Sequence, residues 1–251
     1  MELRDFFAAH PRVALAFSGG VDSAYLLYAG LSCGAEIRPY YVKTQFQPRF
    51  EFEDALRLCR DLGTEPRVLY QDALCISAVQ ANGPDRCYHC KRNIMSTILA
   101  AARKDGYSVL LDGTNASDAS DDRPGMRALQ ELKILSPLRL CGLPKPEIRR
   151  LSREAGLFTW DKPAYACLAT RVKTGEAITE ERLQAIEESE DFLFSLGFTD
   201  FRVRTEGDAA RLQFPEEQLE TARAEEAQIA RKLGAFFESV TIDPKGRIKS
   251  L

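Results

Sequence analysis

The sequence lacks the long hydrophobic runs of membrane and secreted proteins. No stretch approaches the roughly 18 consecutive apolar residues of a membrane-spanning helix, and residues 1–10 lack the apolar segment of a secretory signal. These two absences favour a cytoplasmic protein with no membrane partner. The seven cysteines are odd in number in a chain of 251 residues, which argues against the disulfide framework of a small secreted protein.

An excess of basic charge is missing as well. The formal net charge is -3, so no overall positive field gathers nucleic acid. We therefore expect no nucleic-acid partner. Internal repeats and low-complexity segments are absent too, and the chain is long enough for one large domain or a medium domain plus a small one.

Short apolar runs alternate with segments of helical periodicity over the first two thirds of the chain. Strands are predicted at 12–17, 37–43, 66–70 and 107–112, and helices at 22–32, 50–62, 90–104 and 144–156. This alternation predicts an α/β fold with a parallel, doubly wound sheet and right-handed crossovers. After a linker at 173–178, a helix near 180–196, strands at 201–204, 210–214 and 239–242, and a helix from about 215 predict a small α+β domain. The expected domains are therefore 1–172 and 173–251.

The run SGGVDS, residues 18–23, stands between the first predicted strand and helix. Its glycines allow close backbone approach to an anion, its serines offer hydroxyls, and the helix start provides free N–H groups. The run lacks the spacing and the lysine of a Walker loop. Asp22 beside phosphates makes sense if Mg²⁺ lies between them. The alternative is a glycine-rich turn without a ligand.

SGGVDS is also the signature of the PP-loop family, whose members cleave ATP between the α and β phosphates to make an adenylated intermediate. The resemblance implies an ATP-dependent enzyme with a HUP-like fold, in which Asp22 is catalytic and holds magnesium. The ATP-binding residues implied in this run are Ser18, Gly19, Gly20, Asp22 and Ser23.

In a parallel sheet, ligands bind beyond the carboxyl ends of the strands. The loops after Phe17, Lys43 and Asp112 are therefore expected to converge on one cleft. Small polar residues at 112–118 can bond a nucleotide, and the acids among them can hold the cation; the alternative is an Asx turn. The further candidate ATP-binding residues are Lys43, Gly113, Thr114 and Asn115.

Three cysteines stand apart from the others. Cys87 and Cys90 form a C-x-x-C on a loop expected to enter a helix, where basic neighbours favour thiolates. That pair alone fits structural zinc, a redox pair, half of a cluster site, or no function. Cys167 is the third candidate, and its alternative is a small buried hydrophobic residue. Three thiolates would leave one iron of a [4Fe–4S] cluster open, although the spacing matches no ferredoxin run. The remaining cysteines are expected in the core: Cys33, Cys59, Cys75 and Cys141.

Further segments make the chain similar to the LarE sulfur transferases, which help to build the nickel-pincer nucleotide cofactor of lactate racemase. These segments are GPDRCYHCK, LDGTNASD, LPKPEIR, TWDKP and ACLATR. The resemblance implies that ATP adenylates a carboxylate of pyridinium-3,5-biscarboxylic acid mononucleotide, and that a sulfur nucleophile then expels AMP to leave a thiocarboxylate. In one branch of the family the cysteine of the last segment gives up its own sulfur. The branch with the C-x-x-C is associated with a [4Fe–4S] cluster, which implies Cys87, Cys90 and Cys167 as ligands.

Arg202 and Arg204 alternate on a predicted strand, so both guanidinium groups can point to one face and bind a phosphate. The LarE resemblance implies substrate-binding arginines here, with Glu190 nearby, and an assembly of several subunits; the alternative is a solvated sheet face. Three rival functions remain: a PP-loop tRNA thiolase, an amidating enzyme like GMP synthetase, and a nucleotide-binding module without catalysis. The acidic charge balance speaks against the first, and the lack of a glutaminase module speaks against the second.

Overall fold

The computed structural model describes residues 1–118 and 124–247. The chain divides into two compact units. The first unit comprises residues 1–44, 49–71 and 87–162, and the second comprises residues 45–48, 72–86 and 163 onward. The boundary expected between residues 172 and 173 stays a prediction from the sequence.

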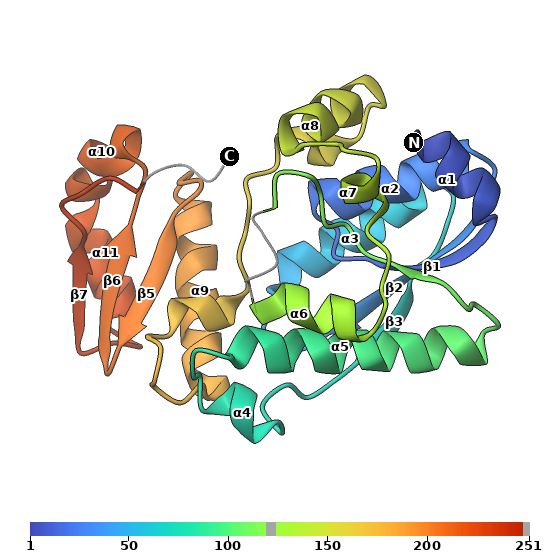
Figure 1. Cartoon of the computed structure of the whole chain (residues 1–251). Coiled ribbons are helices and arrows are strands. Elements are labelled where there is room, and N and C mark those ends of the chain that lie inside the picture. Colours follow the sequence, from blue (N-terminus) through green and yellow to red (C-terminus); the bar gives the residue numbers. More distant parts are fainter. Residues whose placement is uncertain (119–123, 248–251) are drawn as a thin grey trace. The chain divides into compact units, whose positions relative to one another are not determined.

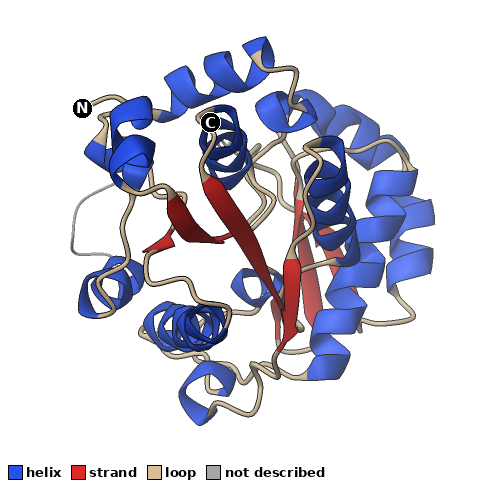
Figure 2. Cartoon of the chain, turned by 90° about the vertical axis from the view of Figure 1, so that its right-hand side faces the viewer, coloured by secondary structure: helices blue, strands red, loops and turns tan. Residues whose placement is uncertain are grey.

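The first unit is built on a four-stranded sheet in the order β3-β2-β1-β4 (Figures 1 and 2). All three pairings are parallel, and β1 runs alongside β2 from Arg12 opposite Glu36 to Ala16 opposite Tyr40. The strands are β1 (Arg12–Ala16), β2 (Glu36–Lys43), β3 (Arg67–Tyr70) and β4 (Leu110–Leu111). The predicted parallel α/β sheet is therefore confirmed.

Helices cover both faces of this sheet. Val13 and Leu15 of β1 are buried against one group of helices, and Ala14 and Ala16 are buried against another. The first group is α1 (Leu3–Ala9), α2 (Val21–Ser32), α3 (Arg49–Asp61), α7 (Pro137–Leu140) and α8 (Lys145–Glu154); the second is α5 (Arg86–Lys104) and α6 (Pro124–Glu131). A strand buried on both faces is apolar throughout, which explains why β1 reads as a continuous hydrophobic run.

The second unit has a separate three-stranded sheet in the order β5-β6-β7. β5 and β6 are antiparallel, and β6 and β7 are parallel. The strands are β5 (Arg202–Glu206), β6 (Ala209–Gln213) and β7 (Ser239–Ile242); the helices are α4 (Ser77–Gln80), α9 (Glu180–Ser195), α10 (Leu219–Ala224) and α11 (Glu226–Leu233). Short 3₁₀ turns are η1 (Phe158–Asp161, in the first unit), η2 (Leu168–Arg171) and η3 (Glu216–Gln218). The small α+β part is thus present.

Several predicted element ends are wrong. α5 begins at Arg86, so Cys87 and Cys90 both lie within the helix and not on a preceding loop. The reason is that Pro84 is the last helix-breaking residue before this stretch. β4 starts later than predicted, because Tyr107 still bonds Ala102 and closes the end of α5. The helix predicted from Pro215 is divided into η3, α10 and α11, and the sequence does not predict α1, α4, α6 or α7.

The core assignment of the remaining cysteines is half wrong. Cys59 is buried and Cys141 is partly buried, but Cys33 and Cys75 are exposed. Cys33 is the C-cap residue of α2, directly before the turn at Gly34, and the Cys75 thiol donates to Asp72 at the surface. None of the helices in the described ranges has the length and apolar character needed to cross a membrane.

Candidate functional site

The SGGVDS segment joins β1 to α2 as predicted. Gly19 has φ +76°, and a Cβ added there would lie 2.8 Å from the Cβ of Ala55 on α3. Only glycine therefore fits at this point of the loop. Gly20 is the N-cap residue of α2, so the free N–H groups and the positive dipole end of that helix face the loop. The Ser18 and Ser23 hydroxyls lie 3.1 Å apart, and the Ser23 hydroxyl donates to the Gly20 carbonyl at 3.2 Å.

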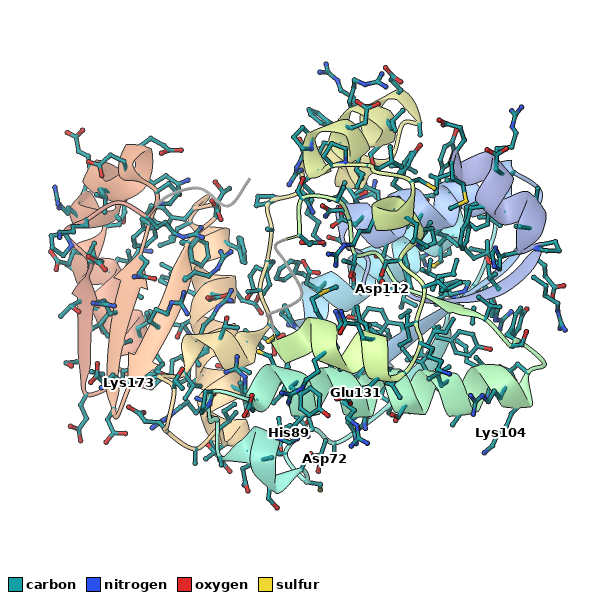
Figure 3. The ribbon with its side chains drawn as sticks, in the orientation of Figure 1. Asp72, His89, Lys104, Asp112, Glu131 and Lys173 are labelled. Carbon is teal, nitrogen blue, oxygen red and sulfur yellow. The ribbon has the colours of Figure 1, made fainter. Side chains whose placement is uncertain are left out.

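The loop after β4 packs directly onto the first turn of α2. A Cβ added to Gly113 would lie 3.0 Å from the Ser23 backbone nitrogen. Asn115 Nδ2 donates to Asp22 Oδ1 at 3.3 Å. The structure therefore brings together the loops after Phe17 and Asp112, as the strand order requires (Asp112 is labelled in Figure 3).

Asp22 is surrounded by groups that act on its charge. Lys145, the first residue of α8, places Nζ 2.6 Å from Asp22 Oδ2. Burial raises the pKa of the Asp22 carboxyl, Lys145 opposes that rise, and the charge of Asp118 adds to it. Lys145 is not among the site residues predicted from the sequence. The signal that could have identified it is its place after Pro144, at a predicted helix start.

The 112–118 loop is held by its own side chains. Asp112 is buried and accepts hydrogen bonds from Ser136 Oγ, at 2.6 Å, and from the Thr114 hydroxyl. Lys91 of α5 places Nζ 3.8 Å from this carboxylate. Asn115 Oδ1 accepts from the Ser117 backbone at 2.7 Å. The Asx turn, which was the alternative interpretation of this segment, is therefore present. The same loop also packs against α2.

Lys43 is the last residue of β2. Its carbonyl accepts from the Gln71 backbone at 3.0 Å, and its side chain is partly buried. The strand order puts this end of β2 beside the end of β1.

This end of the sheet can bind a triphosphate with a divalent cation. An anion is stabilised at the N-terminus of α2, and Lys145 adds a positive charge. Mg²⁺ usually takes one or two carboxylates and completes its shell with water and substrate phosphates. Asp22, with Asp118 nearby, supplies a donor set of that kind.

The three singled-out cysteines are accessible to different degrees. Cys87 is exposed, whereas Cys90, one turn further along α5, and Cys167 are partly exposed. The Cys167 carbonyl accepts from the Thr170 backbone at 2.9 Å and from its hydroxyl at 2.8 Å, which starts η2. Over residues 1–118 and 124–247, no three His, Cys, Asp or Glu side chains are arranged to hold a metal ion.

Glu190 of α9 is buried in the second unit. Its carboxylate forms a buried ion pair with Arg171, with Nε 2.9 Å from Oε1, and accepts from the Val203 backbone at 2.9 Å. It also accepts from the Tyr165 hydroxyl, whose pKa is raised by burial and by the Glu190 charge. Glu190 thus joins α9, η2 and β5.

Arg202 and Arg204 make different contacts. Arg202 is buried and donates to the carbonyls of Ala164 and Phe201, both at 2.6 Å. Burial, with the nearby charge of Arg171 next in importance, lowers the pKa of Arg202 to about 10. Arg204 is half-buried and donates to Gln213 and to the Thr170 carbonyl.

Arg204 lines a cavity of about 510 Å³ in the second unit, whereas Arg202 does not. The cavity is rich in cations and hydroxyl groups; Lys173, one of its lining residues, is labelled in Figure 3. Its charged lining residues are Arg171, Lys173, Arg204, Arg211 and Glu206. Thr205, another lining residue, has a buried hydroxyl oxygen with no hydrogen-bond partner in the described part of the chain. Such a lining suits an anionic ligand.

Comparison with known proteins finds relatives along almost the whole chain, although no family model matches. An uncharacterised protein of Synechocystis sp. is 35% identical over 252 residues, covering 97% of this chain and 92% of the relative. Pyridinium-3,5-bisthiocarboxylic acid mononucleotide synthase of Lactiplantibacillus plantarum is 31% identical over 238 residues, covering 94% and 86%. An uncharacterised protein of Methanocaldococcus jannaschii is 30% identical over 233 residues, covering 92% and 89%.

More distant similarity reaches other proteins with nucleotide chemistry. GMP synthase of Aeropyrum pernix is 28% identical over 200 residues, which are 70% of this chain and 38% of that protein. The tRNA-specific 2-thiouridylase MnmA of Thermotoga sp. is 24% identical over 193 residues, which are 60% and 54%.

Proposed function

The chain belongs to the LarE family of PP-loop, ATP-dependent sulfur transferases, and from this membership we propose that it adenylates a carboxylate of pyridinium-3,5-biscarboxylic acid mononucleotide and converts it to a thiocarboxylate for nickel-pincer cofactor synthesis. The substrate is supported by the L. plantarum relative, which is named for the bisthiocarboxylic acid mononucleotide. The observation that supports the proposal is the pairing of Asp22, in the first turn of α2, with Lys145 of α8, because a helix start with an added cation suits a triphosphate.

The first step is an attack on ATP. A carboxylate oxygen of the substrate forms a bond to the α-phosphorus, the bond to the bridging β-phosphate oxygen breaks, and pyrophosphate leaves with the electron pair. The α2 N–H groups and Lys145 stabilise the phosphate charge, and Asp22 holds Mg²⁺. Bound magnesium neutralises charge on the leaving pyrophosphate. The acyl-adenylate gives the substrate a good leaving group, which a free carboxylate lacks.

The second step is attack by sulfur on the acyl carbon, which expels AMP. Cys167 is the proposed catalytic thiol. Arg171 Nη1 donates to the Cys167 carbonyl at 3.5 Å, so a positive charge lies beside the proposed nucleophile. If Cys167 itself is the donor, its sulfur forms a thioester with the acyl carbon, and loss of the Cα proton then breaks the Cβ–Sγ bond, which releases the thiocarboxylate and leaves dehydroalanine. If a [4Fe–4S] cluster is the donor, Cys87, Cys90 and Cys167 would hold it and it would supply sulfide. Iron and acid-labile sulfide in anaerobically prepared protein support the cluster, and loss of sulfur mass from the chain after turnover supports Cys167 as donor.

The phosphate of the mononucleotide is proposed to bind in the cation-rich cavity of the second unit. Arg202, Arg204 and Glu190 are the candidates from the sequence, and Arg204 is the one that lines this cavity. Arg204→Ala is expected to raise the KM for the mononucleotide by roughly 10- to 100-fold, because it removes one charge-assisted hydrogen bond to the phosphate. The KM for ATP should stay unchanged. Arg211→Ala provides a second variant of the same lining.

The test of the function is an anaerobic incubation with ATP, Mg²⁺, sulfide and the dicarboxylate mononucleotide. We expect equal amounts of pyrophosphate and AMP, and a thiocarboxylate product by mass spectrometry; ATP without the mononucleotide is the control. Pyrophosphate release with tRNA in place of the mononucleotide would replace this proposal by a tRNA thiolase, and no release with either would leave a nucleotide-binding module. We also propose a homo-oligomer without a nucleic-acid partner, which light scattering and tRNA titration test.

A further inference from the structure

One wall of the cation-rich cavity in the second unit is a single stretch of chain. Residues 170–174 all line the cavity, and they include two of its cations, Arg171 and Lys173. After Arg171, the last residue of η2, this wall belongs to no helix or strand. Its shape therefore depends on bonds to other segments of the same unit.

The β5 strand holds the wall from the cavity side. Val172 forms a parallel bridge with Thr205, and the Lys173 N–H donates to the Thr205 carbonyl at 3.1 Å. Arg204 donates to the Thr170 carbonyl. These bonds leave the carbonyl groups of Val172 and Lys173 to be satisfied by another part of the unit.

Asn82, from the 72–86 segment of the same unit, supplies that contact. It is fully buried, and its Nδ2 donates to the Lys173 carbonyl at 2.9 Å and to the Val172 carbonyl at 3.4 Å. Its own backbone carbonyl accepts from the Gly175 N–H at 2.9 Å. One residue thus binds the wall at two consecutive carbonyls and again just after its end.

Arg86 fixes the direction in which the Asn82 amide points. Arg86 Nη1 donates to Asn82 Oδ1 at 2.6 Å and to the Ala169 carbonyl, directly before the wall, at 2.8 Å. Because Oδ1 accepts from Arg86, the donor nitrogen of the amide faces the wall. Asn82 also has φ 54°, a left-handed conformation that asparagine adopts more readily than most residues. This place therefore needs a side chain with both a donor and an acceptor that tolerates positive φ.

We propose that Asn82 is a positioning residue that holds the 170–174 wall of the cavity, so that Arg171 and Lys173 are in place for the phosphate of the mononucleotide. The inference rests on the proposed function for the identity of that ligand. A binding site is precise only when its lining residues are themselves held by packing and hydrogen bonds. Asn82 does this for a wall that has no ladder of its own.

Three variants separate the contributions of Asn82. Asn82→Asp keeps the shape and the acceptor for Arg86, but replaces the Nδ2 donor by an oxygen that faces two carbonyl groups. Asn82→Gly suits the positive φ and keeps the backbone bond to Gly175, so it covers the case in which the buried carboxylate prevents folding. Gln80→Glu makes the same amide-to-acid change on an exposed side chain two residues away, and it is the matched control.

The first test is hydrogen exchange of the full chain without ligand, which does not depend on catalysis. Mass spectrometry follows the amides of Lys173 and Gly175, with peptides from β6 as the internal reference. We expect both Asn82 variants to speed exchange of the two wall amides roughly tenfold or more, with β6 unchanged, and Gln80→Glu to change neither. Unchanged exchange in the wall, or an equal rise in β6, overturns the proposal.

The second test is the steady-state rate of pyrophosphate release with the mononucleotide and ATP varied in turn. Asn82→Gly should raise the KM for the mononucleotide roughly tenfold, with kcat and the KM for ATP close to those of the unaltered protein. A fall in kcat at unchanged KM, or an equal rise in both KM values, contradicts the inference. If the unaltered protein releases no pyrophosphate, the proposed function is rejected, and the exchange result still decides whether Asn82 holds the wall.

Discussion

The sequence predicts some residues of the phosphate-loop site and misses others, as Asp22 and Lys145 show. The place of Asp22 in SGGVDS predicts a magnesium role from the sequence alone. Its neighbour Lys145 could not be found in that way, because 122 intervening positions separate them and only the packing of α8 brings Nζ to 2.6 Å. Local signatures identify loop residues, whereas a partner from a distant helix needs the fold.

The first prediction concerns Asp22 itself. Asp22→Asn removes the carboxylate proposed to bind magnesium and should lower pyrophosphate release by roughly a hundredfold or more. Burial raises the pKa of this carboxyl, so its ionised form opposes folding, and the neutral amide should leave the unfolding midpoint at pH 7 unchanged or higher. Release at the original rate would remove the magnesium argument.

The second prediction uses the pH dependence of the same group. Only ionised Asp22 binds Mg²⁺, so its raised pKa places the acid limb of pyrophosphate release above the ordinary aspartate pKa of about 3.9. Lys145 lowers that pKa, and Lys145→Met should therefore move the acid limb to higher pH. The profile of kcat/KM measures this shift, with Lys104→Met on the surface as control. An acid limb that stays in place would show that Lys145 does not govern Asp22.

At the level of elements, the 112–118 loop can pack closely against α2 because Gly113 has no side chain. Gly113→Ala puts a methyl group 3.0 Å from the Ser23 backbone nitrogen, which pushes the loop away from the helix start. We expect the KM for ATP to rise about tenfold, measured with the mononucleotide in excess. Gly83→Ala has no atom within 4 Å of the added methyl group and should leave the KM unchanged, so an equal effect at both sites would count against the contact.

A second element-level feature with a measurable consequence is the buried Glu190, which joins α9 to η2. Glu190→Ala leaves the Arg171 guanidinium buried without its partner and should lower the free energy of unfolding by about 3–5 kcal/mol. Glu188→Ala, on the exposed side of the same helix, is the control in urea unfolding. A loss confined to substrate affinity, with stability intact, would assign Glu190 to binding alone.

Elements with clear periodicity were predicted well, and elements fixed by tertiary contacts were not. β1, β2, α2 and α9 lie within one or two residues of their predicted ranges, since each combines an apolar pattern with a glycine or a capping residue at its end. The short helix α7 and the early start of α5 have no such signal. The parallel order of the first sheet followed from alternation, but the contact of Gly113 with α2 required coordinates.

For the whole molecule, the two compact units divide the proposed chemistry. Residues 18–23, 112–118 and Lys145 all belong to the first unit, whereas Cys167, Arg171 and the cation-rich cavity belong to the second. The strand order could be predicted from sequence, but the membership of residues 72–86 in the second unit could not. It rests on contacts such as that of Asn82 with Lys173, which no local pattern encodes.

This division predicts that the two steps fail separately. Cys167→Ala should still consume one equivalent of ATP and release pyrophosphate, because the proposed adenylation step does not use the Cys167 thiol. It should form no thiocarboxylate and should accumulate the acyl-adenylate. Asp22→Asn should abolish both, and Cys33→Ala, an exposed thiol on α2's C-cap, should abolish neither. Quenched-flow sampling with mass spectrometry follows pyrophosphate, the adenylate and the product in one experiment. If Cys167→Ala also stops pyrophosphate release, the thiol takes part in adenylation, and the assignment of separate steps to separate units fails.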